Sequence, residues 1–387
     1  MTSKTYDVVI VGGGLVGAVL ALALGKSNIK TALIESSRPE TTDSEWDSRI
    51  YAITPANVEF LRGLDVWDML DSTRITAIHA MHIWGDSSAT PLAFDAYSAG
   101  VAELSWIAES RLMHSAILDA IRSTPAIEVC CPARCIDLKW TADAATLNLQ
   151  DGTKLTTKLI VAADGANSWV RQQAGITVEK TPYFQQGIVA NFTTSLPHQY
   201  IARQWFKRDG VLAWLPLPDR RISMVWSLFD EQANELLKLD NDAFCQTVAE
   251  AGQHMLGTLQ LITPPAAFPL AVQRSAALVA PRLALVGDAA HLVHPLAGQG
   301  MNLGLRDVQS LAGIIAESSQ DAGNWLALRR YERGRKADIL AMQTVTYGLQ
   351  KLFNNDNPML GWLRNTGLNA VDKISPLKRL LIAQAIA

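Results

Sequence analysis

The sequence has few charged residues and few cysteines. Charged side chains make up 18% of its 387 residues, below the ~25% of average soluble domains. The formal net charge is −3, from 34 Lys and Arg against 37 Asp and Glu, so no nucleic-acid partner is expected. The four cysteines include no Cys-x-x-Cys pair. They exclude a disulfide scaffold and fit a reducing compartment, so we expect a cytoplasmic protein.

The sequence also lacks a convincing transmembrane segment. Residues 8–25 are an unbroken run of 18 apolar or glycine residues, close to the length of a membrane-spanning helix. Five of them are glycines, three in a row, which is unfavourable inside a helix. A strand, a glycine turn and a helix explain the run better than a membrane span or a signal peptide. Hydrophobic residues reach 49%, enough for a large core, and the length suggests two domains.

The first 35 residues predict a β-α-β unit. Residues 6–11 are apolar on both faces apart from Asp7, as in a buried parallel strand, and a helix over 15–25 and a strand over 30–34 follow. Strands are expected over 75–95 and 127–161, with a helix that begins at Ser110 between them.

Residues 179–275 have a different character. Trp205, Trp214 and Trp226 lie in β-like stretches, and a helix is expected near 231–252. These tryptophans either form a plain core or line a ligand pocket, and both interpretations stay open. A strand over 282–288, a helix from about Gly300 and a mainly helical remainder complete the pattern.

Gly12, Gly14 and Gly17 form a G-x-G-x-x-G turn directly after the first strand. Such glycines let the backbone approach a pyrophosphate, and the helix N-terminus that follows supplies free N–H groups. Glu35 ends the second strand, where a carboxylate accepts hydrogen bonds from an adenosine ribose. Because its charge disfavours a 2′-phosphate, the turn predicts FAD or NAD rather than NADP.

Two further strand ends carry a Gly/Asp pair, Asp164-Gly165 and Gly287-Asp288. A carboxylate at such a position suits a ribityl hydroxyl. Residues 295–302 lead into another helix N-terminus, whose partial positive charge stabilises a reduced flavin ring. The set as a whole favours FAD.

Three stretches carry a resemblance to a known family. They are DSRIYAI at 47–53, GDAAHLVHPLAGQGMNLGLRD at 287–307 and LRNTGL at 363–368. Together with the glycine turn they resemble the class A flavoprotein monooxygenases, which have the fold of para-hydroxybenzoate hydroxylase. More narrowly, they resemble the ubiquinone-biosynthesis hydroxylases of the UbiH/UbiF/VisC group. The resemblance covers essentially the whole chain.

The resemblance implies an α/β fold. It comprises an FAD-binding, Rossmann-like three-layer domain, an inserted β-sheet substrate domain and C-terminal helices. The expected boundaries are 1–178 and 276–330 for the FAD-binding domain, 179–275 for the substrate-binding domain and 331–387 for the C-terminal helical region. The cofactor-binding residues implied by matching position are Gly12, Gly14, Gly17, Glu35, Arg111, Asp164, Gly165, Asp288, Pro295, Gly298, Gly300, Met301 and Asn302. Arg49, His294 and Pro295 are the candidate catalytic residues beside the flavin.

The implied activity is hydroxylation of an aromatic ring. NAD(P)H would reduce the flavin, O2 would add to form a C4a-hydroperoxide, and its distal oxygen would pass to a hydrophobic polyprenylated phenol on the way to ubiquinone. One alternative is a hydroxylase of a small soluble aromatic acid, for which Arg203, Arg220 and Arg221 would form a cationic clamp. The other is a flavoprotein reductase or scaffold that does not hydroxylate.

No metal site is expected, because no cluster of carboxylates or thiolates accompanies His291 and His294. A polyprenyl substrate suggests contact with the inner face of a membrane or with a ubiquinone-biosynthesis enzyme complex. The last residues, 374–387, are strongly apolar and lie among Lys373, Lys378 and Arg379. They would either lie in a membrane interface or pack on the protein or on a second subunit of a homo-oligomer.

Overall fold

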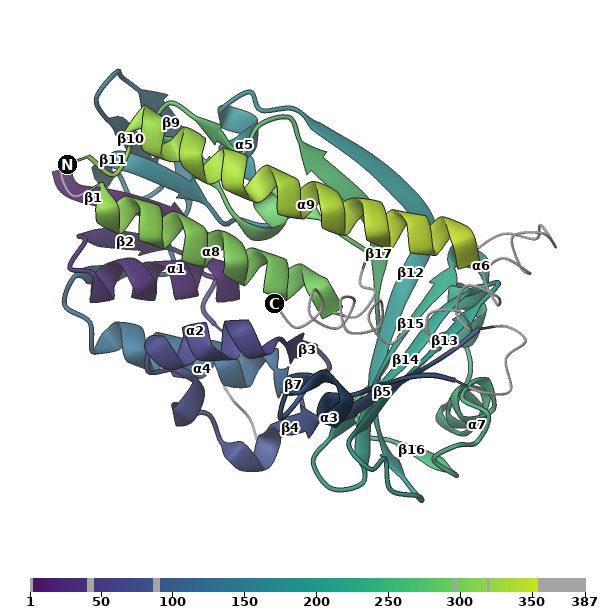
Figure 1. Ribbon diagram of the computed structural model, residues 1–387. Coiled ribbons are helices and arrows are strands. Elements are labelled where there is room, and N and C mark those ends of the chain that lie inside the picture. Colours follow the sequence, from purple (N-terminus) through teal and green to yellow (C-terminus); the bar gives the residue numbers. More distant parts are fainter. Residues whose placement is uncertain (1–2, 40–44, 86–90, 295–297, 319–320, 354–387) are drawn as a thin grey trace.

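The computed structural model describes residues 3–39, 45–85, 91–294, 298–318 and 321–353. Figure 1 shows an α/β part that contains both a parallel sheet and long helices, and a large second sheet that stands at the end of those helices. The C-terminal stretch 354–387, with its predicted tail, lies outside the described residues.

The first sheet is built around parallel strands. Its order β19-β11-β1-β2-β8 is parallel throughout, while β9 and β10 form an antiparallel meander with β11. The predicted β-α-β opening is thereby confirmed. The strands are β1 (Ser3–Val11), β2 (Thr31–Ile34), β8 (Ile127–Cys130), β9 (Cys135–Trp140), β10 (Ala145–Leu149), β11 (Lys154–Ala162), β18 (Val279–Ala280) and β19 (Leu283–Leu285).

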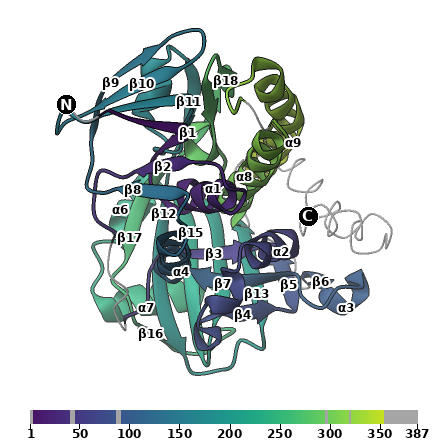
Figure 2. The same cartoon turned by 90° about the vertical axis from the view of Figure 1, so that its left-hand side faces the viewer.

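Helices cover this sheet. The helix α1 is buried along almost its whole length, because it lies against β2 and between α4 and α8. The helix α9 packs on α8, and Figure 2 shows it at the outer edge of the molecule. The helices are α1 (Leu15–Lys26), α2 (Pro55–Gly63), α4 (Ser110–Arg122), α5 (Trp169–Gln173), α8 (Gln299–Glu317) and α9 (Trp325–Phe353).

The second sheet has nine strands, and α6 (Asp230–Leu236) and α7 (Asn241–Ala251) accompany it. The predicted range 179–275 supplies most of its strands, while β5, β6 and β20 come from outside that range. The prediction of one helix near 231–252 is wrong, since Asp240 begins a second helix by accepting a hydrogen bond from the backbone N–H of Ala243 at 2.8 Å. The strands are β5 (Ala80–Trp84), β6 (Leu92–Asp95), β12 (Val178–Thr194), β13 (Ile201–Lys207), β14 (Gly210–Leu217), β15 (Arg221–Phe229), β16 (Leu259–Leu261), β17 (Ala266–Ser275) and β20 (His291–Leu292).

The strands of a small third sheet alternate along the chain with strands of the nine-stranded sheet. The small sheet contains β3 (Ile50–Ile53), β7 (Ser105–Glu109) and β4 (Thr76–Ile78), so the strands predicted over 75–95 are divided between two sheets. The remaining short elements are α3 (Ala96–Ala99), η1 (Trp67–Met69), η2 (Ser72–Arg74) and η3 (Gly287–Ala289). Across the described ranges, no helix combines the length and the apolar character that crossing a membrane requires.

Candidate active site

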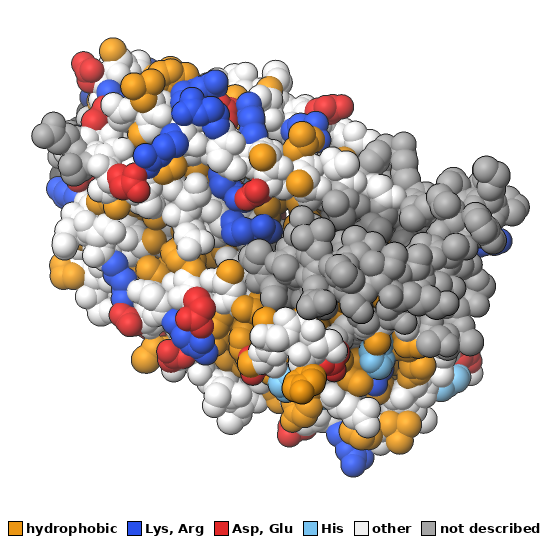
Figure 3. All heavy atoms as spheres, in the orientation of Figure 1, with side chains coloured by type: hydrophobic (Ala, Val, Ile, Leu, Met, Phe, Trp, Pro, Cys, Tyr) orange, Lys and Arg blue, Asp and Glu red, His pale blue; other side chains and the backbone are white. Residues whose placement is uncertain are grey.

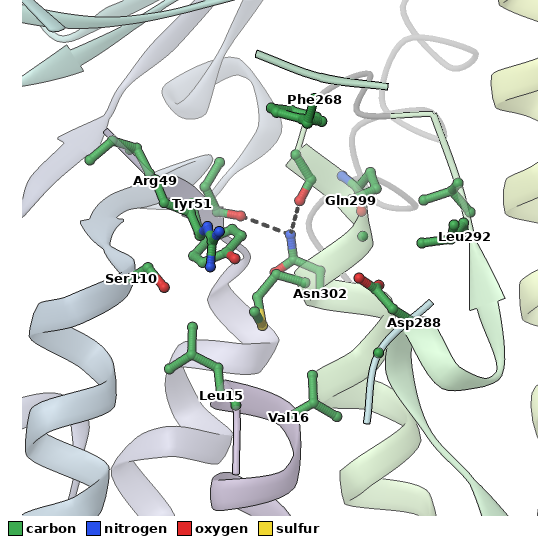
Figure 4. Close-up of a pocket in the computed structure, with 18 of the residues that line it drawn as sticks. Leu15, Val16, Arg49, Tyr51, Ser110, Phe268, Asp288, Leu292, Gln299 and Asn302 are labelled. Atoms are coloured by element: carbon green, nitrogen blue, oxygen red, sulfur yellow. Dashed lines mark hydrogen bonds between the residues drawn. The ribbon is translucent and has the colours of Figure 1, made fainter. Parts of the chain in front are cut away.

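A cavity of about 2240 Å³ connects the glycine turn with the nine-stranded sheet. Its walls come from the turn before α1, from the start of α8, from β3 and from one face of the large sheet. Figure 4 shows Arg49, Asp288 and Asn302 around this cavity, with Phe268 at one end. Most of the predicted site residues therefore line one continuous space.

The three glycines of the turn differ in what a side chain at each position would meet. Gly12 has φ +108°, and a Cβ there would lie 2.3 Å from the carbonyl oxygen of Ala163. A Cβ on Gly17 would lie 2.0 Å from the carbonyl oxygen of Gly12. These two positions require glycine for the fold itself. A Cβ on Gly14, in contrast, would meet no atom within 4 Å, so this position leaves room for a ligand.

Glu35 is held in place beside the turn. Its Oε2 accepts a hydrogen bond from the Gly13 backbone N–H at 2.8 Å, and its Oε1 accepts one from the Ser37 backbone N–H at 2.9 Å. Burial disfavours the charged carboxylate, but the hydrogen bonds from Ser37, Gly13 and Ser36 outweigh this and lower the pKa of Glu35. Glu35 is thus a fixed carboxylate at the cavity wall, suited to accept a hydrogen bond from a ribose hydroxyl.

Two residues at this end were missed by the sequence reasoning. His114 on α4 lines the cavity, and its Nε2 lies 2.7 Å from the carbonyl oxygen of Gly13. Asp47 is buried and accepts hydrogen bonds from the backbone N–H groups of Arg49 at 2.9 Å and Arg111 at 3.0 Å. Asp47 thereby fixes the loop that presents Arg49 and the first turn of α4, which presents Arg111. The signal in the sequence was the DSRIYAI stretch, in which Asp47 precedes Arg49 by two positions.

Asp164 and Gly165 follow the end of β11 and line the cavity. The Oδ2 atom of Asp164 accepts a hydrogen bond from the backbone N–H of Val170 at 3.1 Å. Its Oδ1 atom is buried and has no partner among the described residues. Gly165 has φ +81°, and a Cβ there would meet nothing within 4 Å. A carboxylate oxygen that lacks a partner in a cavity is suited to a ligand hydroxyl.

Asp288 points into the cavity from η3 (Figure 4). Gly287 before it has φ +58°, and its backbone N–H donates to Oδ2 of Asp307 at 3.0 Å. The surrounding protein raises the pKa of Asp288 by desolvating the carboxylate, and the nearby His291 and Arg49 partly oppose this. The side chain nevertheless stays accessible from the cavity, so a hydroxyl donor can reach it there.

The start of α8 closes the cavity beside β3. Gly298 has φ +65° at the N-terminal cap, and Gly300 and Met301 line the wall. The Asn302 side chain is used by the fold: its Nδ2 donates to the carbonyl oxygen of Ala52 at 2.8 Å, and its Oδ1 accepts from the Thr54 backbone N–H at 3.0 Å. Asn302 therefore holds β3 against the helix N-terminus. Pro295 lies outside the described residues.

The two histidines of the 287–307 stretch are both buried. The Nε2 atom of His291 lies 2.6 Å from Oδ2 of Asp307. His294 packs edge-on against Tyr183, with ring centroids 5.0 Å apart, and burial lowers its pKa to about 4. His294 is absent from the cavity wall, unlike Arg49. Within the described ranges no group of three or more His, Cys, Asp or Glu side chains is arranged to hold a metal ion.

The tryptophans of the large sheet form a core on the face opposite the cavity. Trp205, Trp214 and Trp226 pack with residues of α6 and α7, whereas the cavity wall takes alternate residues such as Gln204 and Ala213. Successive side chains on a strand point to opposite faces. The same strand pairing therefore places the tryptophans on one face and the cavity-lining residues on the other. The sheet therefore presents a wall of mainly aliphatic residues to the cavity.

The arginines considered as a clamp do not converge on the cavity. Arg203 borders it, but its Nη1 donates to the carbonyl oxygens of His198 and Ile201 at 3.0 Å each. Arg220 donates to the carbonyl oxygen of Ser195, and Arg221 pairs with Asp219. Neither of these two lies in the cavity wall.

These features fit FAD. The space at Gly14, the anchored Glu35 and the unpartnered oxygen of Asp164 suit a dinucleotide, and Asp288 and the start of α8 suit its flavin half. A family model described as an FAD binding domain matches residues 5–346. The chain belongs to this family and is an FAD-dependent monooxygenase by class.

Two curated relatives narrow the class. The chain is 36% identical to the 3-demethoxyubiquinol 3-hydroxylase of Escherichia coli (strain K12), over 100% of both chains. It is also 36% identical to the ubiquinone hydroxylase UbiL of Rhodospirillum rubrum, over 99% of this chain and 90% of the relative. Within the monooxygenases it therefore belongs with the group that contains these ubiquinone hydroxylases.

Solved structures show the same fold. The probable FAD-dependent monooxygenase pqsL from Pseudomonas aeruginosa superimposes with a TM-score of 0.79 at 22% identity, over 91% of this chain and 97% of that one. The p-nitrophenol 4-monooxygenase PnpA from Pseudomonas putida DLL-E4 gives 0.81 at 17% identity, over 100% and 99%.

Proposed function

We propose that the protein hydroxylates an electron-rich aromatic ring that carries a polyprenyl chain, as a step in ubiquinone biosynthesis. The observation that carries this proposal is the apolar face of the large sheet. It lines the same cavity as the glycine turn and offers a wall for a hydrophobic substrate. Relatives named as ubiquinone hydroxylases along the whole chain support it. NAD(P)H is the proposed electron donor.

Bound FAD supplies the chemistry by which O2 is activated and one oxygen atom is transferred. The chain's own residues bind and orient. Gly14 admits the pyrophosphate, Glu35 and Asp164 accept hydrogen bonds from hydroxyl groups, and Asp288 holds the ribityl chain. Arg49, which faces Asp288 across the cavity in Figure 4, adds a positive charge beside the flavin. The N-terminal end of α8 stabilises negative charge on the ring, and the aliphatic wall keeps water away from the reacting atoms.

The two alternatives differ from this proposal in observable ways. A small aromatic acid would need a cation aimed at its carboxylate, and the arginines of the large sheet are engaged elsewhere. A reductase or scaffold would consume no O2 in proportion to product.

We also propose that the protein meets its substrate at a membrane surface, with peripheral contact, or within a complex of biosynthetic enzymes. A polyprenyl chain partitions into the bilayer, so the ring has to be collected there or delivered by a carrier. A homo-oligomer is compatible with either route.

The test is coupled turnover of the FAD-loaded protein with 2-geranylphenol and NADH or NADPH. We expect one hydroxylated product, detected by mass spectrometry, for each O2 and each NAD(P)H consumed. NAD(P)H oxidation that yields hydrogen peroxide without product for every prenylated ring, together with efficient hydroxylation of hydroxybenzoates, would favour the soluble-acid alternative. Flavin reduction without O2 uptake would favour the reductase.

A further inference from the structure

One row of side chains crosses the cavity face of the large sheet. The register pairs Ile83 with Gln204 and Gln204 with Ala213, and the row continues through Val225 and Val189. All five residues line the cavity. Neighbouring strands are about 4.8 Å apart, so the row is a continuous strip of wall across five strands.

Gln204 is the polar member of this strip. Gln204 is only 6% exposed. On the cavity face of the sheet, its neighbours on the adjacent strands are Ile83 and Ala213. Its neighbours along its own strand are Ala202 and Phe206. Arg203, the other polar residue that this sheet adds to the described cavity wall, already donates to two carbonyl oxygens.

The carboxamide of Gln204 makes no hydrogen bond to the described residues. An amide in aliphatic surroundings without a partner lowers stability relative to an apolar side chain of the same size. Residues that break a local packing rule in this way are found at functional sites. A carboxamide offers both an N–H donor and a carbonyl acceptor, so it can bind a phenolic hydroxyl or a ring ether oxygen.

We propose that Gln204 is a positioning residue that hydrogen-bonds an oxygen substituent of the aromatic substrate. This inference rests on the proposed function, because it assumes that the ring binds against this wall. The small apolar residues of the strip, Ala213, Val225 and Val189, leave room beside Gln204 for the rest of the ligand. The hydrogen bond fixes which ring carbon faces the flavin.

The experiment compares wild-type holoprotein with Gln204→Leu, using two ligands. The ligands are 2-geranylphenol and the matched ring in which a methyl group replaces the hydroxyl, and binding is followed by the change in flavin absorbance. A neutral hydrogen bond contributes about a threefold to tenfold difference in affinity. We expect Gln204→Leu to lose that factor for the phenol, to keep the affinity for the methyl analogue, and to unfold at the same or a higher temperature.

Gln185→Leu is the matched control. Gln185 is a buried glutamine of the same sheet, its amide also lacks a partner in the described part, and it is absent from the cavity wall. This variant should bind both ligands like the wild type. Equal weakening of both ligands by Gln204→Leu, or an unchanged preference for the phenol, would overturn the inference. If the wild type itself binds neither ring, the proposed function fails rather than the role of Gln204.

Discussion

At the scale of single residues, the glycines of one motif serve different purposes. Gly12 and Gly17 are needed because any side chain would collide with backbone carbonyl oxygens, while Gly14 faces open space. The backbone at Gly14 has φ −64° and ψ 178°, which any residue adopts. A side chain at this position therefore leaves the fold intact and competes with the ligand.

We predict that Gly14→Val folds normally and fails to retain FAD. A valine placed in the space for the pyrophosphate should weaken FAD binding by about 10-fold to 100-fold, from the usual cost of overpacking. Gly313→Val is the control, because a Cβ there also meets nothing within 4 Å and Gly313 lies on α8 away from the cavity wall. The measurement is the flavin-to-protein absorbance ratio after purification. A fully yellow Gly14→Val protein would contradict the assignment of the turn.

The glycine turn and Glu35 could be predicted because they are close in sequence and follow a recognisable strand and helix. The contacts of Asp47 with Arg111 and of His114 with Gly13 could not, since these partners lie 64 and 101 residues apart in the sequence. Asn302 was predicted to bind the cofactor, and the sequence contained no sign that its side chain also reaches the backbone of β3. The roles of these residues toward FAD remain predictions.

At the scale of elements, a buried carboxylate ties α9 to α8 and to the Gly287–Asp288 turn. Asp307 on α8 accepts hydrogen bonds from the backbone N–H of Gly287, from His291 and, at 2.7 Å, from Nε of Arg335 on α9. Burial disfavours the charge, but His291 and Arg335 outweigh it and lower the pKa of Asp307. The outer helix thus supports a turn that lines the cavity.

We predict that Arg335→Met lowers the free energy of unfolding by about 3–5 kcal/mol, because it removes the guanidinium that pairs with a fully buried carboxylate. Arg330→Met is the control on the same helix: Arg330 pairs with Glu317 at the exposed surface, and such a pair contributes less than about 1 kcal/mol. The measurement is urea unfolding of both holoproteins. Equal losses of unfolding free energy in the two variants would show that the buried Asp307–Arg335 pair contributes no more to stability than the exposed pair.

The sequence pattern of the strands did not predict which face of the large sheet lines the cavity. The alternation of residues along β13, β14 and β15 was visible in the sequence, but the choice of face was not. It depends on α6 and α7, which cover the tryptophan side and leave the aliphatic side to the cavity. The break between α6 and α7 was missed for a local reason, the cap formed by Asp240. A shift of one residue would have reversed every assignment on these strands.

At the scale of the whole molecule, positive charge gathers over α9. Figure 3 shows Lys and Arg side chains along the face where this helix lies. Among the side chains of this helix whose burial the structure describes, the exposed cations are Arg329, Arg330, Arg333 and Lys336. Each Lys or Arg near an anionic bilayer contributes ~1 kcal/mol of attraction. The proposed membrane contact therefore has a candidate electrostatic surface in addition to the basic and apolar residues of the C-terminal sequence.

We predict that the double variant Arg330→Gln/Arg333→Gln floats about tenfold less with vesicles that contain phosphatidylglycerol, because two cations are lost from the face proposed to meet the lipid. Binding to neutral phosphatidylcholine vesicles should be weak and unchanged. Arg62→Gln/Arg122→Gln is the control with the same change in net charge, made on α2 and α4. A chain that ends at Asp372 measures the part played by residues 373–387. Equal flotation of all four proteins would remove both surfaces as membrane contacts and leave delivery by a carrier or an enzyme complex as the route for the substrate.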